Sequence, residues 1–207
     1  MSRGRFITLE GGEGAGKSTQ VRRLAAWLEG RGIEAITTRE PGGSPGAEAI
    51  RTLLVDGATD RWDAVTETML HFAARRDHLR VTVLPALERG AWVVSDRFAD
   101  STRAYQGIVQ GAGDDLVERL YAIAVGELRP DLTLVLDLPV EKGLARATER
   151  GGENRYERMG RAFHERLRLA FLDIAAADPQ RCVVVDADDG PDAVAGRIAS
   201  VVAERLS

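Results

Sequence analysis

A glycine-rich segment near the start of the chain has the residue types and spacing needed to bind a phosphate. Residues 10–18 read Glu-Gly-Gly-Glu-Gly-Ala-Gly-Lys-Ser and follow an apolar run that begins at Phe6. Glycines at positions 11, 14 and 16 allow backbone conformations closed to other residues, so successive N–H groups can turn towards one oxyanion. A G-x-x-x-x-G-K-S pattern between a predicted strand and a predicted helix is typical of a phosphate-binding loop. The alternative is a glycine-rich turn that binds nothing. The candidate nucleotide-binding residues are Gly11, Gly12, Glu13, Gly14, Ala15, Gly16, Lys17 and Ser18.

The last two residues of this segment supply a cation and a hydroxyl. Lys17 is predicted to reach the β- and γ-phosphates of a nucleotide as a point charge, and Ser18 to ligate a Mg²⁺ ion that bridges them. Only Lys17 and Lys142 are lysines among the 28 basic residues. Because a guanidinium is too broad to replace an ammonium against a phosphate loop, a lysine here indicates a chemical requirement.

Two predicted strands further along the chain have charged residues at or directly after their ends. Arg39 follows the strand predicted at 33–38, and the turn Glu-Pro-Gly-Gly after it could aim Arg39 into a cleft. A turn without a ligand fits the spacing equally well. Asp96 ends the strand predicted at 91–96, where a carboxylate can order Mg²⁺, and Arg97 beside it can hold a phosphate. The alternative is a helix-start aspartate beside a surface arginine.

A long predicted helix at 64–89 carries an aromatic ring close to arginines. His71, Phe72 and Arg75 lie within one turn of it, an arrangement that suits a flat base bearing oxygen atoms. The alternative is a core phenylalanine beside a solvated arginine pair.

Four arginines flank Gly151 and Gly152 in residues 146–158. Such a segment could form a short lid that closes over transferring phosphates, with Arg150 and Arg155 among its cations. A solvated helix end is the alternative, and spacing alone favours it.

Strands and helices alternate along the chain, which predicts an α/β fold. Besides the segments above, strands are predicted at 132–137 and 181–186, and helices at 17–31, 46–56, 99–107, 114–126, 140–150, 156–177 and 191–206. The pattern favours one domain over residues 1–207, with a five-stranded parallel sheet, helices on both faces and the site at the carboxyl ends of the strands.

The composition limits the classes of partner. The net charge of −4 gives no global basic field, so no nucleic acid polymer is expected as a partner, and an anionic ligand needs local arginines. Cys182 is the single cysteine and is predicted to be a buried strand residue in a reducing compartment. The sequence shows no apolar stretch of transmembrane length and no signal peptide, so we expect a cytoplasmic protein without a membrane partner.

Four segments in this order resemble the bacterial thymidylate kinases, a family of P-loop nucleoside monophosphate kinases. They are residues 10–18, Thr-Arg-Glu-Pro-Gly-Gly (38–43), Asp-Arg-Phe-Ala-Asp-Ser-Thr-Arg-Ala-Tyr-Gln-Gly (96–107) and Arg-Pro-Asp-Leu-Thr-Leu-Val-Leu-Asp (129–137). The resemblance implies a P-loop NTPase fold, a homodimer, and transfer of the γ-phosphate of Mg·ATP to dTMP, giving dTDP and ADP, a step towards dTTP.

The resemblance also implies roles for individual residues. The implied catalytic residues are Lys17, Asp96, Arg97, Arg150 and Arg155, with Ser18 and Asp96 at the metal. The implied substrate-binding residues are Glu13 at the sugar hydroxyl, Arg39 and Arg97 at the dTMP phosphate, Arg75 at the thymine carbonyl, Tyr105 at the 2′ position, Gln106 against the base, and Ser101, His71 and Phe72.

The sequence departs from the family pattern in two places. One branch of the family has an arginine in the loop where this chain has Gly14, so the chain resembles the other branch, in which a lid arginine acts; Arg150 matches best and Arg155 second. The family's base-stacking phenylalanine is expected four residues before Arg75, where this chain has His71. The stacking ring is therefore His71 or Phe72.

Two other classes of protein share the phosphate-binding loop. A regulatory GTPase normally reads guanine with Asn/Thr-Lys-x-Asp, and neither lysine here has an aspartate two residues later. A kinase for another small acceptor is the nearer alternative, and only the resemblance over 96–107 counts against it. A nucleotide-binding module without activity is disfavoured by the intact loop and Asp96.

Overall fold

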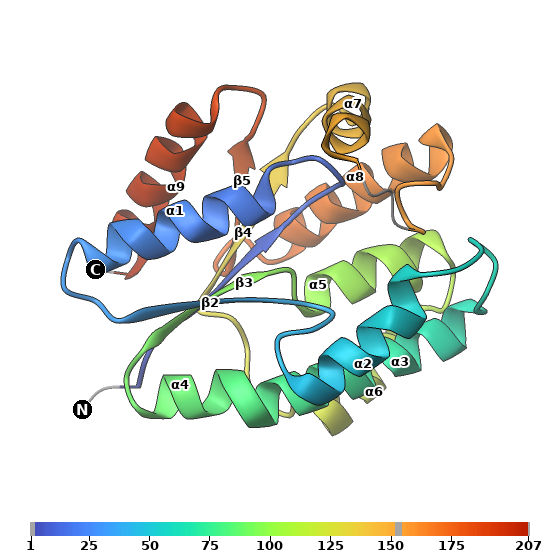
Figure 1. Ribbon diagram of the computed structural model, residues 1–207, viewed down its shortest axis with the longest axis horizontal. Coiled ribbons are helices and arrows are strands. Elements are labelled where there is room, and N and C mark those ends of the chain that lie inside the picture. The colour runs from blue at the N-terminus through green and yellow to red at the C-terminus, as the bar shows by residue number, and fades with distance from the viewer. Residues whose placement is uncertain (1–2, 152–154, 207) are drawn as a thin grey trace.

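A five-stranded, all-parallel sheet forms the centre of the molecule (Figure 1). The computed structural model describes residues 3–151 and 155–206. The strand order is β2-β3-β1-β4-β5, so β1 lies in the middle. The strands are β1 (Phe6–Glu10), β2 (Ala35–Arg39), β3 (Trp92–Asp96), β4 (Leu132–Asp137) and β5 (Cys182–Asp186). Every residue of β1 is buried, as expected for a central strand with helices on both faces, which confirms the predicted α/β architecture.

Helices cover both faces of this sheet. α1 (Lys17–Glu29) and α9 (Pro191–Leu206) pack together on one face, around an apolar core that includes Leu9, Leu134 and Ile198. The other face is covered by helices that include α4 (Leu84–Glu88) and α8 (Arg161–Ala177), over two further apolar clusters (Figure 1). The remaining helices are α2 (Pro45–Val55), α3 (Ala64–His78), α5 (Ala99–Thr102), α6 (Asp114–Ala124) and α7 (Val140–Arg150).

Two predicted helices contain π-helical turns. The helix predicted at 64–89 consists of α3, a π segment η1 (Leu79–Val83) and α4. Pro85 lacks an N–H group and would clash with the carbonyl four residues earlier in a regular α-helix, and the wider π turn just before it relieves this conflict. The helix predicted at 99–107 likewise continues from α5 into a π segment η2 (Arg103–Val109).

The helix predicted from residue 156 instead begins at Arg161. Residues 155–159 form turns, and Gly160 precedes the helix. The side chains of Arg155 and Tyr156 are buried in contacts with α3, so this segment follows the surface of α3 rather than continuing α8 towards its N-terminus.

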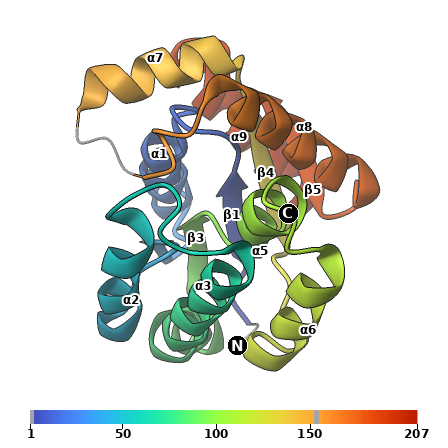
Figure 2. The same ribbon diagram turned by 90° about the vertical axis from the view of Figure 1, so that its right-hand side faces the viewer.

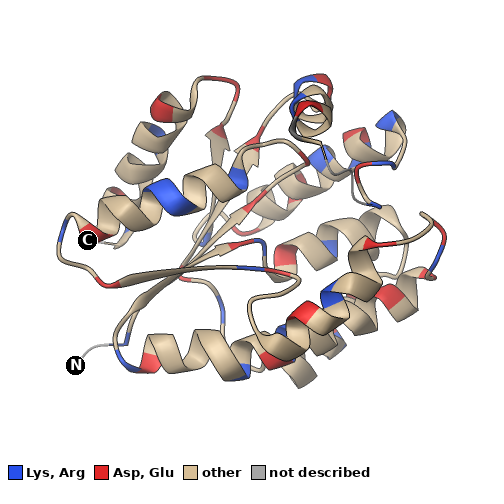
Figure 3. Cartoon of the chain, in the orientation of Figure 1, with Lys and Arg blue, Asp and Glu red and all other residues tan. Residues whose placement is uncertain are grey.

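Cys182 is buried in β5, which confirms its predicted place in the core. No helix in the described part of the chain is long and apolar enough to cross a membrane. Acidic and basic residues are interspersed over the elements (Figure 3), so attraction for an anion depends on local clusters of arginine.

Candidate active site

The phosphate-binding loop joins β1 to α1. Gly11, Gly14 and Gly16 have φ values of 130°, 68° and 87°, which favour glycine and confirm that the loop needs it at these places. The Lys17 ammonium lies folded over the loop and donates to the carbonyl oxygens of Gly11 (3.1 Å) and Gly12 (2.6 Å). Burial, with the positive charge of Arg97 nearby, lowers the pKa of Lys17 to about 8. A bound phosphate would compensate this desolvated charge.

The loop also packs directly on the first turn of α7. A Cβ atom built on Gly14 would lie 1.9 Å from the carbonyl oxygen of Gly143, and one built on Gly143 would lie 2.4 Å from that of Glu13. The two backbones are therefore in contact without side chains between them. Figure 2 looks onto this end of the molecule, with α7 at the top and α2 and α3 at the bottom.

Ser18 and Asp96 meet beside the loop. The Ser18 hydroxyl donates to Oδ2 of Asp96 at 2.5 Å, although the two residues come from α1 and the end of β3. Both are hard oxygen donors of the kind that Mg²⁺ prefers. In the described part of the chain no group of three or more His, Cys, Asp and Glu side chains could hold a metal ion. This pair therefore fits an ion that takes its other ligands from phosphates and water.

Arg97 follows β3 in a left-handed conformation, with φ of 72°. Its Nη1 donates to the Gly11 carbonyl and the Ser101 hydroxyl, both at 3.0 Å. Its Nη2 donates to Glu13 at 2.9 Å and to Tyr105 at 3.0 Å. Burial alone would raise the pKa of Glu13, but Arg97 and Lys17 lower it to about 2, so the carboxylate stays ionised. These four contacts fix Arg97 between the loop and η2.

A cleft of about 630 Å³ opens from the loop towards α3 and η2. It brings together most of the residues that the sequence singled out. These are Glu13, Gly14, Gly16, Lys17, Ser18, Arg39, His71, Arg75, Asp96, Arg97, Ser101, Tyr105 and Gln106. Gly11, Gly12 and Ala15 belong to the same loop and line a smaller pocket on its other side.

Two buried side chains at the α3 end of the cleft each keep one polar atom without a partner. Arg75 uses Nε for an ion pair with Glu40 (2.7 Å) and Nη2 for Phe98 and Thr102, but its Nη1 has no hydrogen-bond partner among the described residues. In the same described part, Oε1 of Gln106 is also without a partner. Buried polar atoms are normally paired, so a donor and an acceptor here point to a polar ligand.

His71 and Phe72 lie on different sides of α3. His71 lines the cleft, whereas Phe72 is buried in the core, where its ring packs edge-on against Tyr121 and under the Arg75 guanidinium. Burial, and then the positive charge of Arg75, lowers the pKa of His71 to about 3, so its ring is neutral at pH 7. The alternative prediction for this helix was a core phenylalanine beside solvated arginines. It is correct for Phe72 but wrong for Arg75, which is buried.

Comparison with known proteins identifies the family. The sequence matches the family model described as thymidylate kinase over residues 9–198. The chain belongs to the thymidylate kinase family. A curated thymidylate kinase from Caulobacter vibrioides is 59% identical over 100% of this chain and 99% of its own length, and one from Jannaschia sp. is 53% identical over 98% and 97%. A crystal structure of thymidylate kinase from Ehrlichia chaffeensis covers 97% of this chain and 99% of its own, with 31% identity and a TM-score of 0.79.

One of the two predicted lid arginines, Arg155, does not lie where a lid residue is expected. Arg155 is fully buried, does not line the cleft, and forms an ion pair with Glu67. The side chain of Arg150 and residues 152–154 lie outside the described residues. Of the two predicted lid arginines, the structure therefore describes only the side chain of Arg155, and it does not bring that side chain to the cleft.

Several residues that line the cleft were not predicted from the sequence, among them Arg51, Tyr156 and Glu157. Arg51 lines the cleft from α2 and donates to the Pro41 carbonyl at 2.7 Å, and Tyr156 and Glu157 line it from the turn before α8. Arg51 lies in a predicted helix whose spacing does not indicate which face meets the site. Tyr156 and Glu157 were assigned to a helix that begins only at Arg161.

Glu10 supports Arg97 from within the sheet. It is fully buried at the end of β1 and accepts hydrogen bonds from the Phe98 backbone (2.7 Å) and the Ser101 hydroxyl (2.5 Å). Burial, with the negative charge of Asp100, raises the pKa of Glu10 to about 8, so the carboxyl group is mostly protonated at pH 7.

This raised pKa predicts a pH-dependent stability. The folded state binds more protons than the unfolded state between the ordinary pKa of 4.5 and about 8, so Glu10 lowers the stability as the pH rises through this window. Glu10→Gln imitates the protonated form, so its Tm should exceed that of the unchanged chain by about 5 °C at pH 8.5, and by less at pH 6. Thermal melts followed by circular dichroism at both values test this; equal differences at the two pH values would contradict it.

Proposed function

We propose that this chain transfers the γ-phosphate of Mg·ATP to dTMP, giving dTDP and ADP. Family membership supports the reaction, and the observation that carries the acceptor is the pair of unpartnered atoms at the end of the cleft. The Arg75 Nη1 donor suits a base carbonyl, and the Gln106 Oε1 acceptor suits a ring N–H. Thymine presents these two groups next to each other, whereas cytosine presents an amino group beside a ring acceptor.

The positions of the other cleft residues support the following proposed roles. The loop N–H groups and Lys17 hold the phosphates of ATP. Ser18 and Asp96 would hold Mg²⁺, which would neutralise charge on the phosphates. Arg39, whose side chain is 54% exposed, and Arg97 supply positive charge for the dTMP phosphate. Glu13 and Tyr105, joined by a 2.8 Å hydrogen bond, are proposed to contact the sugar.

Phosphoryl transfer requires positioning and charge stabilisation rather than covalent help from the protein. The dTMP phosphate is itself a competent nucleophile, since its second pKa is about 6. No general base is therefore needed. The lid arginine is proposed to be Arg150, because the Arg155 side chain already forms a buried ion pair with Glu67. His71, which lines the cleft, is proposed as the ring beside the base.

We also infer a homodimer that packs through the long helices. Val65 and Met69 lie one turn apart on α3 and are 42% and 51% exposed, and Ile123 on α6 is 79% exposed. α3 and α6 pack against each other, so these apolar side chains belong to neighbouring helices of one region of the molecule.

Release of ADP from Mg·ATP tests the proposed reaction. The purified protein is offered dTMP, dUMP, dCMP, UMP, AMP and GMP separately, and we expect dTMP to give the highest kcat/KM. A preference for another monophosphate would retain the phosphate chemistry and overturn the base assignment. Inactivity with all six would refute the kinase and favour the nucleotide-binding switch.

A further inference from the structure

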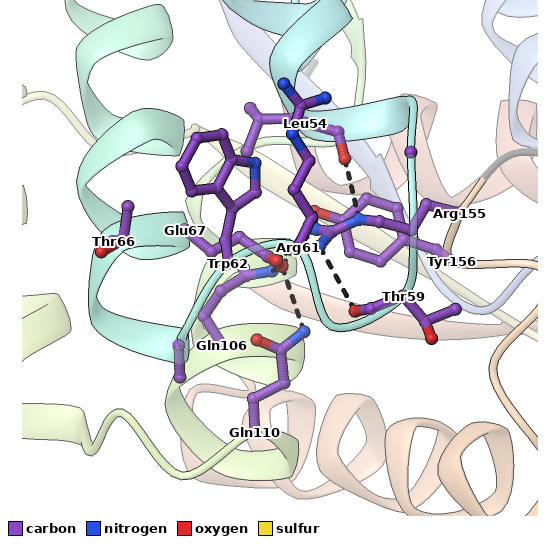
Figure 4. Close-up of polar contacts among 12 residues, drawn as sticks. Leu54, Thr59, Arg61, Trp62, Thr66, Glu67, Gln106, Gln110, Arg155 and Tyr156 are labelled. Carbon is purple, nitrogen blue, oxygen red and sulfur yellow. Dashed lines mark hydrogen bonds and ion pairs between the residues drawn. The ribbon is translucent and has the colours of Figure 1, made fainter.

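A buried carboxylate outside the cleft organises the wall that faces the base. Glu67, on α3, is 1% exposed and does not line the cleft. Its Oε1 accepts hydrogen bonds from Nε2 of Gln106 (2.7 Å), Nε2 of Gln110 (3.0 Å) and the Tyr156 hydroxyl (2.9 Å), and its Oε2 forms an ion pair with Arg155 (Figure 4). We call these five residues the Glu67 cluster.

Glu67 is saturated with donors. An ionised carboxylate offers about four acceptor sites, and four different side chains donate to this one. Arg155 balances its charge and is itself held by the carbonyl oxygens of Leu54 (3.1 Å) and Thr59 (3.5 Å). Both oxygens of Glu67 therefore act as hydrogen-bond acceptors.

This saturation determines the orientation of the Gln106 amide. Only the NH₂ group of Gln106 can face an acceptor, so the amide oxygen must be the atom left over, and it is the one without a partner among the described residues. Gln106 lines the cleft whereas Glu67 does not. Glu67 therefore determines which end of the buried Gln106 amide, beside the cleft, is left without a partner among the described residues.

The same logic extends to His71. The Tyr156 hydroxyl has a single proton, which it gives to Glu67, so its oxygen must accept from Nε2 of His71 at 3.0 Å. The His71 ring then carries its proton on Nε2. One carboxylate, Glu67, thus determines which atoms of the Gln106 amide and of the His71 ring donate hydrogen bonds and which accept them.

We propose that Glu67 is a positioning residue for base selection, which holds the Gln106 oxygen as the acceptor for the N3–H group of thymine. This inference rests on the proposed function. A base with an acceptor at N3, such as cytosine, would face the Gln106 oxygen without a hydrogen bond, and both buried acceptors would be left unpaired.

The test is Glu67→Gln, assayed for kcat and KM with dTMP, dUMP and dCMP. An amide at position 67 can donate, so the Gln106 amide is free to turn and present its NH₂ group to the cleft. We expect kcat/KM for dTMP to fall about 10–100-fold, mainly through KM, and the dCMP/dTMP ratio of kcat/KM to rise about tenfold. The dUMP/dTMP ratio and the KM for ATP should not change, because uracil has the same N3–H and O4 groups as thymine.

Two control variants separate positioning from general loosening of the cluster. Gln110→Met removes another donor to Glu67, but Gln110 does not line the cleft, so the dCMP/dTMP ratio should stay as in the unchanged chain. In a Gln106→Met background, Glu67→Gln should produce no further change in that ratio. A ratio unaffected by Glu67→Gln alone, or changed by it in the Gln106→Met background, would overturn the proposal.

A second variant covers the case in which Glu67→Gln does not fold. The exchanged variant Glu67→Gln/Gln106→Glu keeps one carboxylate and one amide in contact, and position 106 still presents an oxygen to the cleft. It should keep the preference for dTMP over dCMP, and loss of that preference would also overturn the proposal. Absence of dTMP activity in the unchanged chain would instead refute the proposed function, so the two failures are distinguishable.

Discussion

Replacing Lys17 with methionine should lower kcat for dTMP phosphorylation by about 10²–10³-fold, the range found when one charge-stabilising donor is removed from an enzyme site. Methionine keeps most of the aliphatic stem, so the expected loss comes from the missing charge. Lys17→Arg should be nearly as damaging. The ammonium is buried against the Gly11 and Gly12 carbonyls, and a planar guanidinium does not fit there.

The chain offers a matched control for this experiment. Lys142 is the only other lysine, and its exposed ammonium pairs with Asp188 at 2.7 Å. Lys142→Met should leave kcat and KM unchanged. Steady-state ADP release with saturating Mg·ATP and dTMP measures both variants, and a Lys17→Met enzyme within tenfold of the unchanged chain would rule out the proposed role of Lys17.

Replacing Arg97 with methionine should reduce kcat/KM for dTMP by at least about 10³-fold and also lower the Tm. The catalytic loss follows from removing positive charge beside the acceptor phosphate. The loss of stability has a different cause: Glu13 would keep a largely buried carboxylate whose main cationic partner is gone, and breaking such a pair costs about 3–5 kcal/mol.

A double variant separates these two effects. Arg97→Met/Glu13→Gln also removes the negative charge that Glu13 would carry without its partner. The Tm should therefore recover in part, whereas the activity should not. Arg103→Met, which removes a more exposed arginine paired with Asp114, serves as the control and should change neither quantity. Recovery of activity in the double variant would show that Arg97 acts only by balancing Glu13.

Local patterns were sufficient to predict the phosphate end of the site. The loop, Lys17 and Ser18 are contiguous, and their positions depend only on a strand, a tight turn and a helix start. Asp96 could be placed because the carboxyl ends of parallel strands meet at one edge of the sheet. The structure brings it to 2.5 Å from Ser18.

The base end of the cleft depends on contacts that no local pattern contains. The spacing on α3 predicted that His71, Phe72 and Arg75 share a region, but not that α3 has the core on one side and the cleft on the other. The Arg155–Glu67 pair joins residues 88 positions apart, and no motif links them. The sequence therefore predicted Arg155, which lies close to two glycines, as a lid residue. In the structure it is buried and forms an ion pair with Glu67.

The contact of Gly14 with α7 restricts how this sequence can change. An arginine at position 14 would need a Cβ atom where the Gly143 carbonyl lies, in a backbone conformation that disfavours it. A loop arginine and this placement of α7 therefore exclude each other. A chain with its catalytic arginine at position 14 would therefore need a different position for the start of α7. Position 143 should therefore covary with position 14 across the family.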